Sequence, residues 1–162
     1  MMVKKAKTTK KRTTSKRRAP RRPTPKPAPK RSRSASPVDP KDVAIVRTKG
    51  ATGRGGGPKG EAWRIELKGK RAGIVFINWI DEEPIGEHAS IQIYLNEISQ
   101  GRHVGRIGYR LASDASTYDP IYAHMRKSNV ASRRAAEEAG FVDAGIPGVK
   151  QLIMVRRREA AK

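Results

Sequence analysis

Residues 89–112 read ASIQIYLNEISQGRHVGRIGYRLA, and the order of patterns in this stretch decides the fold. Apolar and polar residues alternate from Ala89 to Leu95, which predicts a half-buried strand. The glycine-bearing run Gln100–Gly105 follows, and Arg106–Ala112 then carries an apolar stripe at helical spacing. The stretch therefore predicts a strand, a tight turn and a helix in immediate succession.

Such a turn at a helix N-terminus is a candidate diphosphate site. The first-turn N–H groups of a helix have no partner within the helix, and the helix dipole favours negative charge there. Small residues let a ligand approach the main chain, and Arg102 and Arg106 add positive charge. A plain surface loop is the alternative interpretation of the same residues.

Three strands are expected before this turn. Trp63–Lys68 alternates with period two, Gly69-Lys70 fits a two-residue hairpin, and Ala72–Ile80 continues as a second strand. Together with Ala89–Leu95 these segments predict an antiparallel meander.

After the helix, Ile121–Met125 reads as a strand. Asn129 fits a helix N-cap, Ala131–Ala139 is rich in helix formers, and Gly140 fits a C-cap. A last strand is expected over Lys150–Val155.

These residues resemble the GNAT acetyltransferases. Gln100 and Gly105 match the outer positions of the family's Gln/Arg-x-x-Gly-x-Gly/Ala loop. Asn129 and Gly140-Phe141 match the Asn that opens a later helix and the Gly-Phe pair that closes it. The resemblance covers residues 63–155 and rests on two loose motifs in the right order.

The resemblance implies a fold and an activity. The fold is α+β, a three-layer α/β arrangement whose mixed, mostly antiparallel central sheet is flanked by helices. The activity is transfer of an acetyl group from acetyl-CoA to a primary amine by direct attack in a ternary complex, without a metal. The acceptor is an unknown small molecule, a protein Lys or a protein N-terminus.

The resemblance also assigns the cofactor to the third strand, the turn and the later helix start. The residues so assigned are Ile93, Leu95, Gln100, Gly101, Arg102, His103, Val104, Gly105, Arg106, Asn129 and Ser132. Two positions depart from the family. His103 stands where the first motif glycine belongs, and Ala136 stands where a tyrosine often protonates the thiolate. Tyr109, Tyr118 or Tyr122 are the alternatives for that role.

Candidates for the remaining catalytic roles come from the ends of the cofactor strand. His88 precedes it and has a side chain whose ordinary pKa suits a base, while Glu97 follows it. The sequence therefore offers His88, Glu97 and Tyr122 as catalytic candidates.

Residues 41–60 are expected to form a Gly-rich linker, with Val43–Val46 as a candidate short edge strand, before a domain over residues 61–158. A phosphate loop of the Walker type is excluded there, because Gly60-Glu61 follows Lys59 in place of Ser or Thr. The family usually places a strand and two helices in this region. The acceptor side is therefore expected to be open, or to be completed by a second subunit in a homodimer.

Residues 1–40 predict a disordered Lys/Arg/Pro-rich tail. Residues 1–37 hold 15 of the 36 Lys and Arg and no acid, which leaves 21 basic against 15 acidic residues in the remainder. Basic arms bind polyanions, and the absence of aromatic residues predicts non-specific nucleic-acid contact. A solubilising extension is the alternative interpretation.

The sequence lacks several features that other classes of protein require. Without cysteine there is no disulfide or thiol nucleophile, and the three His lack a paired metal-ligand spacing. No apolar run suits a membrane span or a signal peptide, so a cytoplasmic protein is expected. The competing function is a basic nucleic-acid-binding protein whose GNAT-like domain is degenerate and non-catalytic.

Overall fold

The computed structural model describes residues 36–159 of the chain, so the predicted tail lies almost wholly outside the described residues. Two short 3-10 helices, η1 and η2, accompany the strands and α-helices of this part. The elements are η1 (Pro40–Asp42), β1 (Val43–Thr48), β2 (Glu61–Leu67), β3 (Lys70–Glu82), β4 (Gly86–Leu95), η2 (Glu97–Ser99), α1 (Val104–Ala115), β5 (Ile121–Arg126), α2 (Val130–Glu138), β6 (Val142–Asp143) and β7 (Gln151–Arg156).

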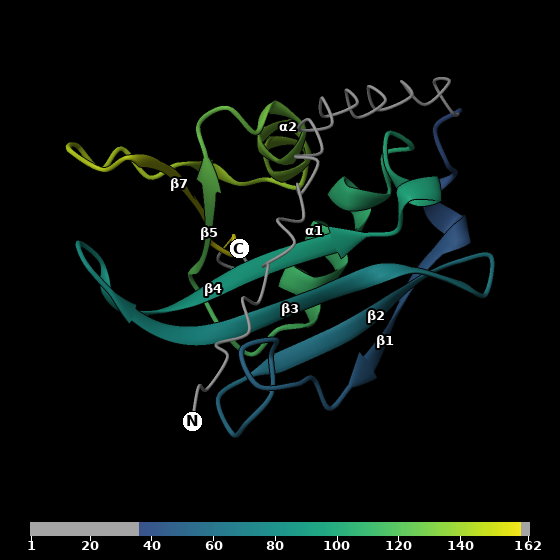
Figure 1. Ribbon diagram of the computed structural model, residues 1–162, viewed down its shortest axis with the longest axis horizontal. Coiled ribbons are helices and arrows are strands. Elements are labelled where there is room, and N and C mark those ends of the chain that lie inside the picture. Colours follow the sequence, from purple (N-terminus) through teal and green to yellow (C-terminus); the bar gives the residue numbers. More distant parts are fainter. Residues whose placement is uncertain (1–35, 160–162) are drawn as a thin grey trace, which may run out of the picture. The chain divides into compact units, whose positions relative to one another are not determined.

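One mixed sheet organises the described residues (Figure 1). Its strand order is β1-β2-β3-β4-β5-β7-β6, and only the β4–β5 pair is parallel. The predicted meander is β2–β3–β4, and the predicted strands over 121–125 and 150–155 are β5 and β7. The expected mixed, mostly antiparallel sheet with packed helices is confirmed.

Both α-helices pack on the same face of the sheet, so residues 36–159 form two layers where the resemblance implied three. Gly108 lets α1 approach closely, because an added Cβ there would lie 2.9 Å from side-chain atoms of Ile65 and Ile93. The main core lies beneath α1, and the buried residues Ala136 and Phe141 extend it under α2. No helix between residues 36 and 159 covers the opposite face, and none of the helices there is long and apolar enough to cross a membrane.

The Gly-rich segment is part of the folded sheet, which corrects the expected linker over 41–60. Strand β1 pairs with β2 along its whole length. After it, the loop is tied to β3: Asn78 Oδ1 accepts from the Gly55 N–H at 2.7 Å, and Asn78 Nδ2 donates to the Gly53 carbonyl at 2.9 Å. Gly55 has φ 71°, and an added Cβ would lie 2.1 Å from the Glu61 carbonyl oxygen. The glycines therefore serve close packing here.

The folded part also begins earlier than the expected tail boundary at residue 40. Val38 is buried, and its N–H donates to the Arg102 carbonyl at 3.1 Å. Residues just after the basic run therefore hold the turn that precedes α1.

A buried carboxylate fixes the connection between α1 and β5. Glu61, at the start of β2, accepts hydrogen bonds from the Ser116 hydroxyl and from the N–H and hydroxyl of Thr117. Arg47 lies 3.5 Å from the same carboxylate. This network sets where β5 begins relative to the rest of the sheet.

Candidate functional site

Strands β4 and β5 diverge and leave a wedge between them. Their parallel pairing consists of two residue pairs, Ala89 with Ile121 and Ser90 with Tyr122. Beyond these pairs, β4 continues against β3 while β5 continues against β7. The main chain of Ile91–Leu95 therefore has no strand neighbour on the β5 side within the described residues. The two parallel strands are therefore splayed beyond Ser90 and Tyr122.

A cavity of about 630 Å³ occupies the open end of this wedge. Ten of the eleven residues assigned to the cofactor line it, and the exception is Arg102, whose carbonyl accepts from Val38. The sequence reasoning did not assign the rest of the lining to the cofactor, because most of those side chains lie on α1 and α2 and reach the cavity only when these helices pack. These residues are Tyr94, Ala131, Arg134, Ala135, Glu138 and Tyr109, the last of which had been named only as an alternative proton donor.

The N-terminus of α1 opens on this cavity. The helix begins at Val104, and its cap residue His103 makes no side-chain capping bond. The first-turn N–H groups are consequently available to an anion. His103 adopts φ 65°, the left-handed conformation that favours glycine. His103 thus has the backbone conformation expected of the motif glycine whose position it occupies.

Charged side chains meet at the mouth of the cavity. Arg106 Nη1 lies 2.9 Å from Glu138 Oε2, and His103 Nδ1 lies 3.9 Å from the same oxygen. Glu138 thus both lines the cavity and pairs with Arg106. Its neighbour Glu137 pairs along the helix with Arg133 at 2.8 Å.

Two of the residues assigned to the cofactor, Gln100 and Asn129, stabilise the main chain at the end of β4 and at the start of α2. Gln100 Nε2 donates to the Leu95 carbonyl at 3.1 Å and closes the turn after β4. Asn129 Oδ1 accepts from the Ser132 N–H at 3.2 Å, which confirms the predicted N-cap of α2.

Of the three tyrosines considered as proton donors, Tyr109 lies in the cavity. It is buried on α1 with its ring 5.7 Å from that of Phe141, and burial raises the pKa of Tyr109 to about 12. The Tyr118 hydroxyl donates to the Lys59 carbonyl at 2.6 Å, away from the cavity lining. Tyr122 packs edge-on against His88 at 5.1 Å on the other face of the sheet.

The three catalytic candidates do not come together. His88 and Tyr122 are in contact, and His88 also meets His124, which the sequence reasoning had not singled out. Glu97 is exposed beyond the opposite end of β4, nine residues from His88. The strand alone separates His88 from Leu95 by about 23 Å, at about 3.3 Å per residue. Glu97 follows in η2, so it cannot act at the same point as His88.

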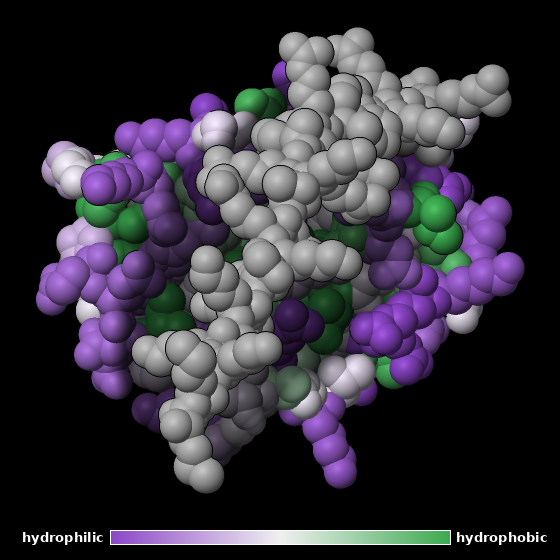
Figure 2. All heavy atoms as spheres, in the orientation of Figure 1, coloured by the Kyte–Doolittle hydropathy of each residue, from purple (hydrophilic) through white to green (hydrophobic). Residues whose placement is uncertain are grey.

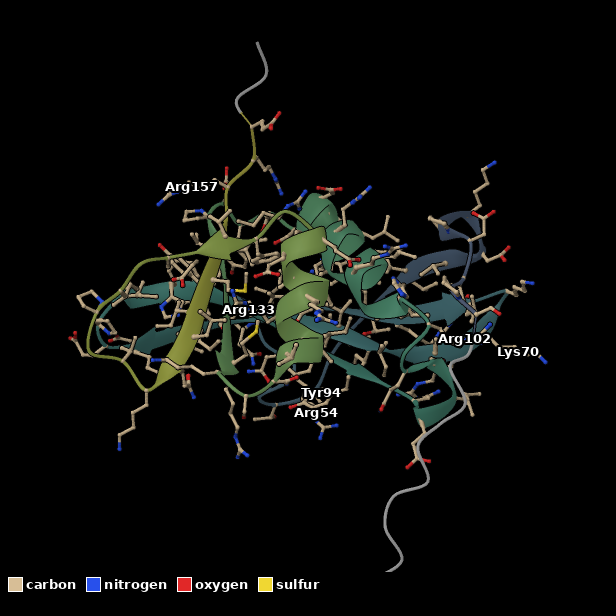
Figure 3. All side chains as sticks on the ribbon, turned by 90° about the horizontal axis from the view of Figure 1, so that it is seen from above. Arg54, Lys70, Tyr94, Arg102, Arg133 and Arg157 are labelled. Atoms are coloured by element: carbon tan, nitrogen blue, oxygen red, sulfur yellow. The ribbon has the colours of Figure 1, made fainter. Side chains whose placement is uncertain are left out.

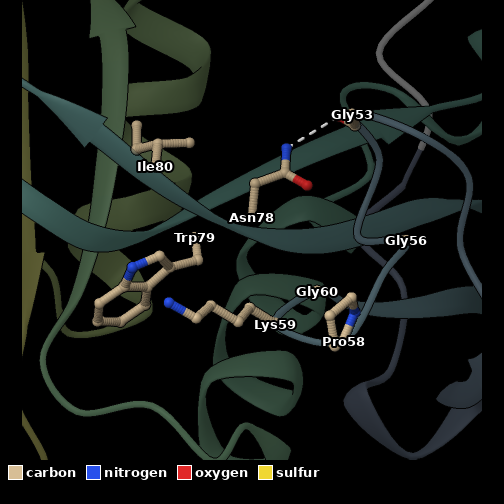
Figure 4. Close-up of a pocket in the computed structure, with 8 residues that line it drawn as sticks. All are labelled: Gly53, Gly56, Pro58, Lys59, Gly60, Asn78, Trp79 and Ile80. Atoms are coloured by element: carbon tan, nitrogen blue, oxygen red, sulfur yellow. Dashed lines mark hydrogen bonds between the residues drawn. The ribbon is translucent and has the colours of Figure 1, made fainter.

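A second cavity lies between the Gly-rich loop and the part of β3 that extends past β2 (Figure 4). Its volume is about 420 Å³, and Gly53, Lys59, Asn78 and Trp79 are among its lining residues. The ammonium of Lys59 lies 5.4 Å from the centre of the Trp79 ring. The cavity therefore already holds a cation against its aromatic wall.

The Gly-rich loop also reaches the cofactor strand. Arg54 lies over the ring of Tyr94, with its guanidinium carbon 5.9 Å from the ring centre (Figure 3). Tyr94 is exposed and stacks on Phe76 at 5.9 Å. The visible described surface is mostly hydrophilic (Figure 2), with Tyr94 among the few exposed large apolar residues.

The sequence matches no protein-family model and no curated protein, but the structure resembles solved acetyltransferases. RimJ from Mycobacterium smegmatis, bound to CoA-disulfide, is 20% identical with a TM-score of 0.50 over 61% of this chain and 53% of its own. A GNAT-family acetyltransferase from Streptococcus agalactiae is 15% identical with a TM-score of 0.52 over 61% and 66%. An apo form of RimL, a ribosomal L7/L12 alpha-N-protein acetyltransferase, is 21% identical with a TM-score of 0.50 over 64% and 72%.

The sheet order, the splayed parallel pair and these similarities define a class. The described part of the chain has the GNAT acetyltransferase fold. The chain spans 53% of the RimJ chain and 66% of the Streptococcus agalactiae chain.

Proposed function

We propose that the protein is an N-acetyltransferase that moves an acetyl group from acetyl-CoA to a primary amine. The observation that carries this proposal is the cavity between β4 and β5. Its lining joins the unpaired side of β4, the uncapped N-terminus of α1 and the start of α2.

Each part of this lining suits a different part of the cofactor. The first-turn N–H groups of α1 and the guanidinium of Arg106 suit the diphosphate, because both favour negative charge. The unpaired main chain at Ile93 suits the amide-bearing pantetheine arm, which can hydrogen-bond to it as a further strand would. In this proposal the thioester lies deep in the wedge, near Ser90 and Tyr122.

The residues around the wedge then position the reaction. The acceptor amine attacks the thioester carbonyl directly, and holding the two reactants together supplies much of the rate enhancement. Tyr109 is the proton donor that this cavity offers to the leaving thiolate. Burial raises the pKa of Tyr109 to about 12, so its hydroxyl remains protonated at neutral pH.

The acceptor reaches the wedge from the helix-free face of the sheet. RimL carries the name of an enzyme that acetylates a ribosomal protein at its α-amino group. A primary amine, either free or at a protein N-terminus or Lys, is the corresponding acceptor class here. The basic residues 1–37 provide polyanion contact that is separate from this chemistry.

Thiol release tests the proposal directly. The full-length protein is incubated with acetyl-CoA and a panel of primary amines that includes a Lys-containing tripeptide amide and spermidine, and free CoA is measured. We expect amine-dependent CoA release together with an acetylated product identified by mass spectrometry. If acetyl-CoA binds but no amine supports release, the competing function of a non-catalytic domain is favoured.

A further inference from the structure

Two histidines from neighbouring strands share a hydrogen bond on the helix-free face of the sheet. The Nε2 atoms of His88 on β4 and His124 on β5 are 2.8 Å apart, and the rings stack with centroids 5.0 Å apart. His88 lies two residues before Ser90, and His124 lies two residues after Tyr122, which pairs with Ser90. The two rings therefore meet near Ser90 and Tyr122, the last parallel pair before the strands diverge.

The hydrogen-bond partners determine which nitrogen carries each proton. His88 Nδ1 lies 2.7 Å from the Gly86 carbonyl oxygen, and because that oxygen only accepts, Nδ1 carries a hydrogen. In the neutral pair His88 Nε2 is then the acceptor, and His124 Nε2–H donates to it. The Nδ1 atom of His124 keeps its lone pair. The basic nitrogen that remains in the pair is His124 Nδ1, and the Gln151 side chain is the other hydrogen-bond neighbour of this ring.

The surroundings of His124 keep that nitrogen unprotonated at neutral pH. Burial and the neighbouring His88 lower the pKa of His124, while Glu82 from β3 and a hydrogen bond with Gln151 from β7 oppose this shift only in part. Tyr122 packs edge-on against His88 beside the pair. His124 is half-buried, so its ring remains within reach of a ligand on this face.

We infer that His124 is the base that accepts a proton from the acceptor amine, and that His88 is a positioning residue that fixes its tautomer. This inference rests on the proposed acetyl transfer and adds to it a residue that the sequence reasoning had passed over. It also gives His88 a role that depends on a partner 36 residues away.

The proton balance of the step is simple. An ammonium R–NH3⁺ gives one proton to His124 Nδ1, and the lone pair so released forms the C–N bond with the acetyl carbon. The C–S bond then breaks and leaves the CoA thiolate. Tyr109 protonates that thiolate, and the second proton, lost from the acetylated nitrogen, restores the Tyr109 hydroxyl. The proton on His124 returns to solvent.

Imidazole NMR tests the pair without any acceptor. The chain contains three His, so the ¹⁵N-coupled ring spectrum of the full-length protein is readily assigned with His-to-Gln variants. We expect His88 as the Nδ1–H tautomer, His124 as the Nε2–H tautomer, and His124 titrating below the ordinary value of 6.5. An Nε2–H tautomer at His88, or two independent titrations near 6.5, would overturn the inference.

Kinetics then test the role of the pair. With the Lys-containing tripeptide amide as acceptor, we expect His124→Gln to lower kcat about 100-fold, as is typical for loss of a general base. It should also remove the acidic limb of the pH profile while leaving the Kd for acetyl-CoA unchanged. His88→Gln should move the acidic limb to higher pH, because it removes a neighbour that lowers the pKa of His124.

The outcomes separate this inference from the proposed function. A wild-type protein that neither binds acetyl-CoA nor releases CoA contradicts the proposed function. A wild-type protein that is active, with an acidic limb that survives in His124→Gln or disappears in Glu97→Gln, contradicts only the role of His124. A melting temperature measured for each variant identifies loss of folding.

Discussion

At the scale of single residues, Gly105 is the most sensitive test of the cofactor site. It lies in the first turn of α1, and an added Cβ would meet only ordinary contacts at 3.6 Å. Gly105→Ala should therefore fold and still bind acetyl-CoA, whereas Gly105→Glu places a carboxylate where the diphosphate is proposed to lie.

Thermal unfolding with and without acetyl-CoA measures the difference. A ligand at 100 times its Kd stabilises the folded state by ~2.7 kcal/mol, so the wild type and Gly105→Ala should both shift to higher Tm. Gly105→Glu should show no shift. An equal shift in all three proteins would place the diphosphate elsewhere.

At the same scale, Glu138 is a carboxylate in a cavity proposed to bind an anion. It holds Arg106 at 2.9 Å, and that guanidinium is then less available to a diphosphate. Glu138→Gln should tighten acetyl-CoA binding several-fold, with a smaller gain at high salt because screening weakens the charge interaction. Glu137→Gln is the matched control, since Glu137 pairs with Arg133 on the helix surface. Equal affinities for the two variants would show that Glu138 does not oppose the ligand.

At the scale of elements, Glu61 connects β2 to the turn before β5. Burial alone would raise the pKa of Glu61, but hydrogen bonds from Ser116 and Thr117 and the nearby Arg47 outweigh it, so the pKa is lowered. A lowered folded-state pKa gives stability that is present above the unfolded value near 4.5 and lost as pH falls through the folded value. Glu61→Gln should therefore cost about 2 kcal/mol at neutral pH.

Chemical denaturation at a series of pH values checks this expectation. The difference in unfolding free energy between the wild type and Glu61→Gln should shrink as the pH falls below about 4.5. A difference that stays constant into acid would mean that ionisation of Glu61 contributes nothing.

The elements also show what the sequence can and cannot predict. Alternation over Trp63–Lys68 and Ala89–Leu95 reports local burial, and the structure confirms strands at both places. The Gly-rich segment was misassigned, because close main-chain packing, as at Gly55, has the same composition as a linker. The pairing of His88 with His124 depends on the register of β4 and β5, which no local pattern encodes.

At the scale of the whole molecule, we expect polyanion binding and acetyl transfer to reside in different parts of the chain. Residues 1–35, outside the described structure, contain no acidic residue, and all 15 acidic residues lie beyond them. Deleting these residues retains Val38 and its bond to Arg102. The deletion should weaken duplex DNA binding equally for unrelated sequences and flatten the slope of log K against log salt, which is about −0.9 per neutralised phosphate. CoA release with spermidine should be unchanged.

Salt titrations of both proteins on two unrelated duplexes, beside the thiol-release assay, provide the measurement. A shortened protein that keeps its DNA affinity and salt slope would instead assign polyanion binding to the surface of the described domain, for example around Arg156–Arg158.

Calorimetric titration of acetyl-CoA tests the central claim of a cofactor site between β4 and β5 most directly. With the full-length protein at physiological salt, we expect one saturable site per chain and a Kd below about 1 mM, the upper end of the usual range for enzyme substrates. The same heat should appear when residues 1–35 are removed. Absence of saturable heat, or its loss with those residues, would contradict the account.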